Sequence, residues 1–203
     1  MARMQKALEA FARGEGLCVV DDEDRENEGD LIFSAQHLTV EQVAQMIRDC
    51  SGIVCVCLTG EQCERMALPP MAQDNTNTQG TAFTVAVEAA EGVTTGVSAY
   101  DRWLTIRAAA NPEGRPEDLR RPGHVYPLRA RDGGTLVRRG HTESSIDLCR
   151  LAGLQNTAGV LCELMHPDGT MMRLPDVAAY AKAHGMMMIS VEDIVAWRKA
   201  KGV

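Results

Sequence analysis

LCVVDDEDRENEGDLIFSA, residues 17–35, places an acidic loop between two short apolar runs. The runs LCVV (17–20) and DLIFSA (30–35) predict buried strands. Between residues 21 and 30 stand seven carboxylates and one arginine, and like charges at this density repel one another. An acidic run is usually a solvated turn. Because strands fix both ends of this one, a shaped binding site is the competing interpretation.

The negative charge of the chain is concentrated in this loop. Of the formal net charge of −7, residues 21 to 30 carry −6 (seven acids against one arginine), which leaves −1 for the rest of the chain. This balance argues against a nucleic-acid-binding face. The seven cysteines, several of them in apolar runs such as VCVC, indicate reduced thiols and a cytoplasmic setting. The N-terminus mixes acids and bases on an amphipathic helix, and no apolar run reaches membrane-spanning length.

Helical and strand-like patterns alternate along the chain, and one hairpin signal, His166-Pro167-Asp168-Gly169, interrupts them. This order predicts an α/β fold, a three-layer α-β-α sandwich around a mixed β-sheet. With no repeat or linker in sight, we expect one domain over residues 1–203. Strands are expected over 17–20, 30–35, 52–59, 82–89, 124–130, 159–165 and 186–190. Helices are expected over 4–13, 39–49, 60–66, 100–110, 143–153, 175–185 and 191–202, with Thr39, Ser98 and Thr142 as N-caps, and loops over 71–81 and 111–123.

The carboxylates of the acidic loop are candidate ligands of a metal ion. A calcium EF-hand fails, because its twelfth position would fall on Ala35, where a bidentate glutamate is required. Magnesium needs only one or two carboxylates and accepts oxygens of a substrate as further ligands. Clustered carboxylates also raise one another's pKa, so one of them can carry a proton.

Two other stretches predict anion sites at helix N-termini. GVTTGVSAYDR (92–102) puts small and hydroxyl residues before a capped helix, although an ordinary N-cap is the more frequent explanation of a single such stretch. LVRRGHTESS (136–145) brings Arg138, Arg139 and a glycine to another helix start, which suits a phosphate. His141 stands at that point as a metal ligand or a proton carrier.

Two single residues complete the candidates. His124 follows Pro-Gly, so a turn presents it at the start of a strand. Glu163 lies in the apolar run GVLCELM, where it is costly to bury as a charged group unless alternation turns it to solvent. Cys55 precedes the polar loop 71–81, and its redox role is open. Together these features favour a Mg²⁺-dependent enzyme that acts on a small phosphorylated substrate by acid–base chemistry.

Five stretches carry a resemblance to a known family. DDEDRENEGDL, GTAFTVAVEAAEGVTTGVSAYDR, RPGHVYPLRA, RRGHTESSIDL and GVLCELMHPDGTMMRLP, in this order, resemble the 3,4-dihydroxy-2-butanone 4-phosphate synthases of riboflavin biosynthesis. The resemblance implies conversion of ribulose 5-phosphate into 3,4-dihydroxy-2-butanone 4-phosphate and formate by enolisation, dehydration, skeletal rearrangement and loss of C4. It further implies Mg²⁺ or Mn²⁺, two ions per active site, and a homodimer. No nucleic acid or membrane partner is implied.

The resemblance also implies roles for individual residues. Glu26 and His141 would be metal ligands, and His124 and Glu163 would be catalytic. The implied substrate-binding residues are Arg25, Glu26, Asp30, Thr95, Arg138, Arg139, Gly140, His141, Thr142 and Glu163. Arg139 is less secure, because some members have glycine there.

Two other functions are also compatible with these residues. Another Mg²⁺-dependent ketose-phosphate isomerase or aldolase would release no formate. A non-catalytic cation- or nucleotide-binding module would explain the anion sites but not His124 and Glu163. The GTP cyclohydrolase II domain that often follows this family's domain is not expected here.

Overall fold

A seven-stranded mixed sheet forms the centre of the molecule, with strand order β4-β5-β3-β6-β2-β1-β7. The computed structural model describes residues 1–203. The strands are β1 (Leu17–Val20), β2 (Gly29–Ser34), β3 (Cys55–Leu58), β4 (Val87–Ala89), β5 (Leu119–Arg129), β6 (Gly159–Glu163) and β7 (Met187–Ser190). The helices are α1 (Ala2–Ala12), α2 (Val40–Asp49), α3 (Gly60–Arg65), α4 (Ala99–Ala109), α5 (His141–Leu151), α6 (Leu174–Ala183) and α7 (Val191–Lys201), with 3₁₀ turns η1 (Pro116–Asp118) and η2 (Gly134–Leu136).

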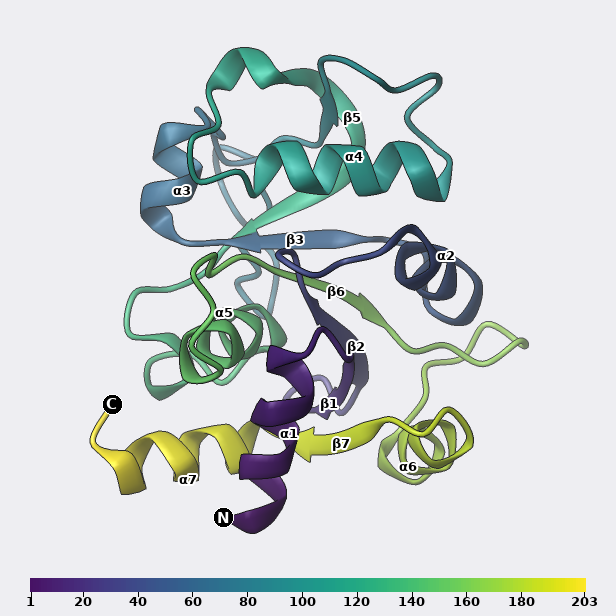
Figure 1. Ribbon diagram of the computed structural model, residues 1–203, viewed down its shortest axis with the longest axis vertical. Helices are drawn as coiled ribbons and strands as arrows, with labels where there is room; N and C mark the ends of the chain where they lie inside the picture. The colour runs from purple at the N-terminus through teal and green to yellow at the C-terminus, as the bar shows by residue number, and fades with distance from the viewer.

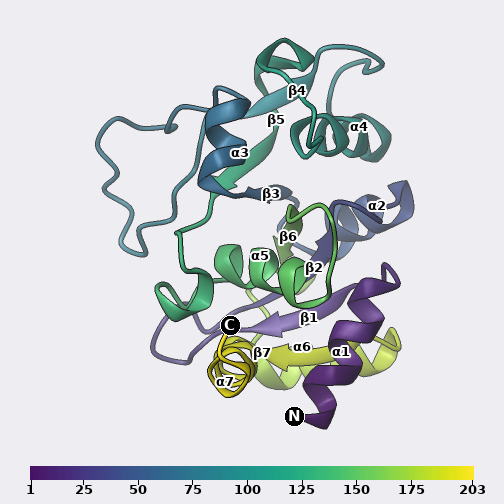
Figure 2. The same cartoon turned by 60° about the vertical axis from the view of Figure 1, so that its left-hand side comes forward.

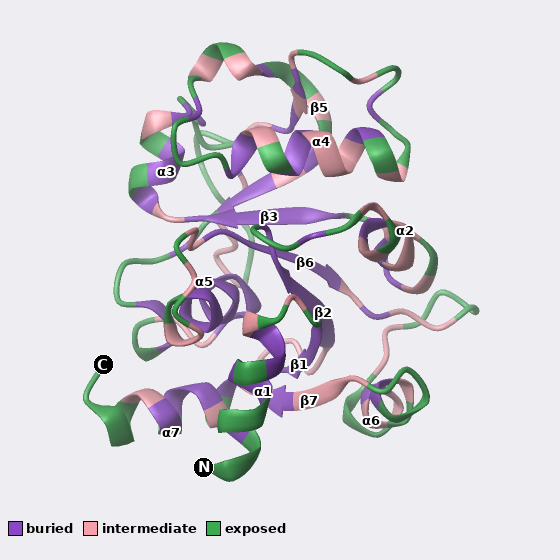
Figure 3. Cartoon of the chain, in the orientation of Figure 1, coloured by how far each residue is buried: buried purple, intermediate pink, exposed green.

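Side-chain alternation along the strands separates two hydrophobic cores. In β1, Cys18 and Val20 face one core, while Leu17 and Val19 face the other, as the period of two in a strand requires. Helices α2, α3, α4 and α6 cover the first face, and α1, α5 and α7 cover the second. In Figure 1, α1, α5 and α7 gather at the lower left, whereas α2 and α6 stand on the right. Figure 3 shows β1, β2, β3 and β6 as almost wholly buried, whereas β7 and the first half of β5 are partly exposed. The predicted three-layer sandwich is therefore confirmed.

Several expected boundaries differ from the structure. The strand expected over 82–89 forms only at Val87–Ala89, where its pairing with β5 shifts register after Val87, and isolated bridges lie nearer its start. Part of the expected loop 111–123 is strand, because β5 begins at the buried Leu119, which pairs with Ala89. The strand expected over 52–59 starts only at Cys55, after a turn at Gly52 (φ +79).

The cap of α5 is also different. Thr142 lies in the first turn of the helix, and Gly140 is the N-cap. The capping box of Thr39 with Gln42 and the cap by Ser98 are confirmed.

The segments that carry the candidate residues lie together at one end of the central strands. The acidic loop joins β1 to β2, and Asp30 in β2 pairs with Glu163 at the end of β6. Helix α5 packs on the second face of the sheet, and its first residue, His141, lies over this end of β2 and β6. The predicted loop 71–81 contains no helix or strand and stands out from the body at the left of Figure 2. None of the helices combines the length and apolar character needed to cross a bilayer.

Candidate active site

Asp21 organises the acidic loop. Its Oδ2 accepts hydrogen bonds from Arg25 Nη1 at 2.7 Å and from the Glu26 amide at 3.1 Å, and its Oδ1 accepts one from the Glu28 amide at 2.9 Å. A buried carboxylate needs such donors, since an unpaired charge away from water is costly. Asp21 therefore folds the loop around itself.

Arginines offset much of the remaining charge of the loop. Arg25 Nη1 also lies 2.6 Å from Glu26 Oε2, so one guanidinium joins two acids of the loop. Arg139 makes a two-point pair with Asp22, at 2.6 and 2.7 Å, and contacts Glu192 of α7 at 2.8 Å. The repulsion in DDEDRENEGD is thus reduced by one arginine inside the loop and one from the segment before α5.

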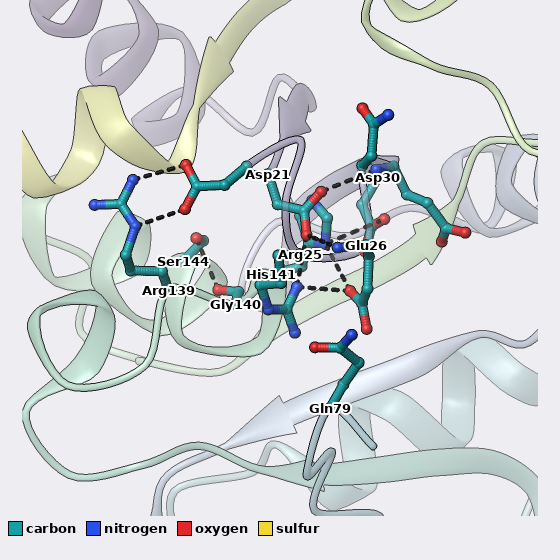
Figure 4. Close-up of polar contacts among 12 residues, drawn as sticks. Asp21, Arg25, Glu26, Asp30, Gln79, Arg139, Gly140, His141 and Ser144 are labelled. Atoms are coloured by element: carbon teal, nitrogen blue, oxygen red, sulfur yellow. Dashed lines mark hydrogen bonds and ion pairs between the residues drawn. The ribbon is translucent and has the colours of Figure 1, made fainter. Parts of the chain in front are cut away.

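Glu26, Asp30 and His141 converge at the base of the loop (Figure 4). The Nδ1 atom of His141 lies 3.5 Å from Asp30 Oδ1 and 3.8 Å from Glu26 Oε2. Its Nε2 lies 3.2 Å from the carbonyl oxygen of Val19, which can only accept, so Nε2 donates there. This contact fixes the ring and leaves Nδ1 facing the carboxylates, the arrangement typical of a histidine that ligates a metal.

Burial and charge together shift the pKa values of these groups. Burial opposes the charged imidazole, but Asp30, Glu26 and Asp21 outweigh it and raise the pKa of His141 to about 9. The contact with His141, helped by Arg25 against the effect of burial, lowers the pKa of Glu26 to about 2. Burial raises the pKa of Asp30 well above its usual value, although His141 opposes that shift.

A small cavity of about 160 Å³ opens above these three residues. Asp30 Oδ1 is buried at this place and has no hydrogen-bond partner, so a cation beside it would satisfy this oxygen. The cavity is lined by Arg25, Glu26, Glu28, Asp30, Asn77, Thr81, Phe83, Leu128, Arg138, His141, Thr142, Leu161 and Glu163. Oxygen and imidazole donors around an orphaned carboxylate oxygen fit a divalent cation.

The N-terminus of α5 forms the second part of the cavity wall. The first helical hydrogen bond runs from the Ser144 amide to the Gly140 carbonyl, so the amides before it are free for an anion. Arg138 bonds Glu143 at 2.7 Å, and a Cβ on Gly140 would lie 2.3 Å from the Arg138 guanidinium. The lack of a side chain at Gly140 therefore leaves space for the Arg138 guanidinium in this position.

Arg138 also connects this wall to the polar loop 71–81. Its Nη2 donates to the Gln79 carbonyl at 3.1 Å and to Thr81 Oγ1 at 3.3 Å. Asn77 and Thr81 thereby reach the cavity from a segment that the sequence identified only as a polar loop.

Two of the expected site residues lie outside the cavity and beside each other. His124 Nδ1 contacts Glu88, and a Cβ on Gly96 would lie 1.9 Å from the same Glu88 carboxylate, so the loop bearing Thr95 packs there. Tyr126 and Leu161 both pair with Cys55, which puts His124 and Glu163 in one cross-strand row. Two strand spacings separate them, about 10 Å.

The structure thus sorts the expected residues into two groups. The cavity group comprises Arg25, Glu26, Asp30, Arg138, His141, Thr142 and Glu163, and Gly140 stands next to it as the N-cap of α5. The second group comprises Thr95 and His124, joined by Glu88, which sequence reasoning missed. Arg139 belongs to neither group, because its guanidinium is turned to Asp22 and Glu192.

Other candidates are less suited to chemistry. Cys55 is buried and its thiol donates to the Ile53 carbonyl at 3.4 Å, and burial raises its pKa well above the usual value. A larger hollow of about 740 Å³ lies between α4 and residues 155–156. Its lining contains no group of side chains close enough to share a metal ion. Such a group is formed by Asp21, Glu26 and His141, and the latter two line the small cavity.

The chain is similar to known proteins over nearly its whole length. The profile of the family described as 3,4-dihydroxy-2-butanone 4-phosphate synthase matches residues 5–197. The synthase of Desulfovibrio desulfuricans is 62% identical over 200 residues, 98% of this chain and 89% of the relative. That of Shewanella loihica is 59% identical over 200 residues, with 98% and 92% covered.

Solved structures agree with these relatives. A 3,4-dihydroxy-2-butanone 4-phosphate synthase in complex with two magnesium ions superposes with a TM-score of 0.94 at 40% identity, covering 98% of both chains. The synthase of Candida albicans superposes with a TM-score of 0.87 at 49% identity, covering 96% of both chains.

Proposed function

This chain belongs to the 3,4-dihydroxy-2-butanone 4-phosphate synthase family, and we propose that it converts ribulose 5-phosphate into 3,4-dihydroxy-2-butanone 4-phosphate and formate, a lyase step of riboflavin biosynthesis. One observation carries the proposal. His141 Nδ1 lies 3.5 Å from Asp30 Oδ1 and 3.8 Å from Glu26 Oε2. This group lies directly beside Arg138 and the N-terminus of α5. A chelating site next to a phosphate site suits a small sugar phosphate.

A divalent cation fits the donor set. Glu26 and His141 would hold it, and the unpartnered Asp30 Oδ1 supplies a further oxygen nearby. Mg²⁺ prefers oxygen ligands, and Mn²⁺ also accepts an imidazole. Because four carboxylates line the cavity, those of Glu26, Glu28, Asp30 and Glu163, we assign two ions to it. Such a cation draws electron density from neighbouring carbonyl and hydroxyl oxygens and makes the adjacent C–H bond easier to deprotonate.

The residues of the chain supply the proton transfers. Burial and neighbouring acids raise the pKa values of Glu28 and Asp30, so these carboxylates are the loop groups best able to accept a proton. Glu163 reaches the cavity from β6 and can return protons to a leaving oxygen. A reaction with several proton steps needs several carriers, which explains why the acids are gathered here.

The phosphate is assigned to the start of α5. Free amides, Arg138 and the hydroxyl of Thr142 present hydrogen-bond donors to one place. Arg138 would exchange its contacts with loop 71–81 for the phosphate, so binding and loop position are coupled.

The second group of residues supports a homodimer. Thr95 and His124 are outside the cavity of their own chain, and the apolar residues Ile53, Val97 and Tyr100 near them are 47%, 47% and 52% exposed. Covering this patch with a second copy would stabilise it. We assign Thr95 and His124 to the cavity of that second copy, where His124 would serve as a proton carrier. We assign this activity to a single domain, residues 1–203, and to the cytoplasm.

The test is formate release from ribulose 5-phosphate with and without Mg²⁺. Formate that depends on the metal supports the proposal, and an isomerase or aldolase would release none. Glu26→Gln and His141→Asn should abolish turnover and retain the fold. Glu23→Gln, an exposed acid of the same loop, is the matched control and should keep it.

A further inference from the structure

Ser51 lies behind the cavity, in the turn between α2 and β3, and does not line the cavity itself. Its hydroxyl lies 2.6 Å from Glu163 Oε2. Its amide donates to the Glu163 carbonyl at 2.8 Å. One residue therefore binds both the main chain and the carboxylate of Glu163.

The direction of the hydroxyl proton follows from its other contacts. The Ile53 amide donates to Ser51 Oγ at 3.2 Å, which uses the oxygen as an acceptor. The Cys162 sulfur lies 3.4 Å away and is a weak acceptor compared with a carboxylate at 2.6 Å. Ser51 therefore donates its proton to Glu163, the stronger, charge-assisted contact.

The turn that carries Ser51 is held in place on its far side. Gly52 has φ +79, a left-handed conformation that glycine adopts without strain. Arg102 donates to the Gly52 carbonyl and to the Val97 carbonyl, each at 2.8 Å. The serine is thus fixed by the main chain and by α4 before any ligand binds.

Glu163 needs such a restraint. It pairs across the sheet with Asp30 and lines the cavity with Glu26, whose low pKa keeps it charged, so repulsion from Glu26 acts on the Glu163 carboxylate. A hydrogen bond to an ionised carboxylate is among the stronger ones in proteins.

We propose that Ser51 is a positioning residue, which holds the Glu163 carboxylate in the cavity for proton transfer. The inference rests on the proposed function for the role of Glu163. It adds a residue that touches no substrate and that no part of the sequence pattern marked.

Ser51→Ala tests this assignment. We expect the kcat for formate release to fall about 10- to 100-fold, while KM for ribulose 5-phosphate and the Mg²⁺ concentration for half activity change less than about 2-fold. Exchange of the substrate's acidic C–H with D₂O, which precedes the step assigned to Glu163, should continue near the wild-type rate. Ser51→Thr, which keeps the hydroxyl, should restore most of the kcat.

Ser190→Ala is the matched control. Ser190 makes a comparable side-chain contact as the N-cap of α7, outside the residues that line the cavity. This variant should lose thermal stability and keep its kcat. If Ser51→Ala behaves in the same way, Ser51 has only a structural role and the inference is wrong.

Two outcomes separate this inference from the proposed function. Wild-type protein that releases no formate contradicts the proposed function. A crystal structure of the Ser51→Ala variant with the Glu163 carboxylate unmoved contradicts the Ser51 inference, whether or not formate is released. Should the alanine variant not fold, Ser51→Cys carries the test, because a thiol keeps the volume but donates weakly. It should lower kcat where Ser51→Thr does not, and equal rates for both would overturn the inference.

Discussion

Arg139 and Asp22 form a two-point ion pair, with Nε–Oδ2 at 2.6 Å and Nη2–Oδ1 at 2.7 Å. The pair connects the acidic loop to the segment before α5, and Glu192 holds the same arginine from α7. A contact between Arg139 and substrate would require this bidentate geometry to open.

We therefore expect Arg139→Ala and Asp22→Ala to have the same effect. Each should raise the Mg²⁺ requirement several-fold by loosening the loop, and the double variant should be no worse than either single one. Steady-state kinetics on the three variants measures this. A rise in KM for sugar phosphate in Arg139→Ala alone would instead place Arg139 on the phosphate.

Arg173 should restrain the other end of the loop. Its Nη1 donates to the Glu26 carbonyl at 2.8 Å and to the carbonyl of Asn27, whose φ is +53. Arg173→Ala should accelerate hydrogen exchange at the amides of residues 26–28 and weaken Mg²⁺ binding several-fold. Lys182→Ala, an exposed change on the same helix, serves as the control. Unchanged exchange in Arg173→Ala would show that the loop holds its shape without it.

The metal-free protein should lose stability as the pH rises from about 6.5 to about 9. Neighbouring carboxylates, against the effect of burial, raise the pKa of His141 from 6.5 to about 9. A raised folded-state pKa contributes stability that is complete below the unfolded value and is lost as the pH passes the folded value. The melting temperature in EDTA across this range measures the effect. His141→Asn should lack the slope, and a wild-type profile that is flat there would contradict this linkage.

Mixed dimers test the assignment of His124 to the other subunit. His124→Ala and Glu26→Gln homodimers should each be nearly inactive. After subunit exchange, half of the dimers are mixed and one of their two sites is intact, so about a quarter of wild-type activity should return. If the mixture stays inactive while mixed dimers form, His124 acts in its own chain or not at all.

Local patterns predicted the fold well, because strand alternation and helix caps are short-range. Residues 17–35 gave two strands and an acidic loop between them, and the Thr39 capping box opens α2 as expected. The boundaries failed where tertiary contacts decide. Leu119 becomes strand because Ala89 pairs with it, and α5 begins at His141 with Gly140 as its N-cap, before the expected start at Glu143.

The site was predictable only in part. Glu26 and His141 stood in motifs that predicted a metal ligand at each place. That the two residues share one cavity depends on long-range sheet pairing, which the local sequence does not show. Glu88 and Ser51 carried no signal, since an acid in a short strand and a serine before glycine are ordinary features. Only the contacts with His124 and Glu163 distinguish them.

The proposed chemistry depends on a divalent cation that Glu26 and His141 bind together. Anomalous diffraction from crystals soaked in Mn²⁺ measures this directly. A peak bonded to Glu26 Oε2 and His141 Nδ1, and absent in Glu26→Gln, is the result expected. Manganese bound elsewhere, with these two side chains unligated in crystals that turn over substrate, would contradict the account.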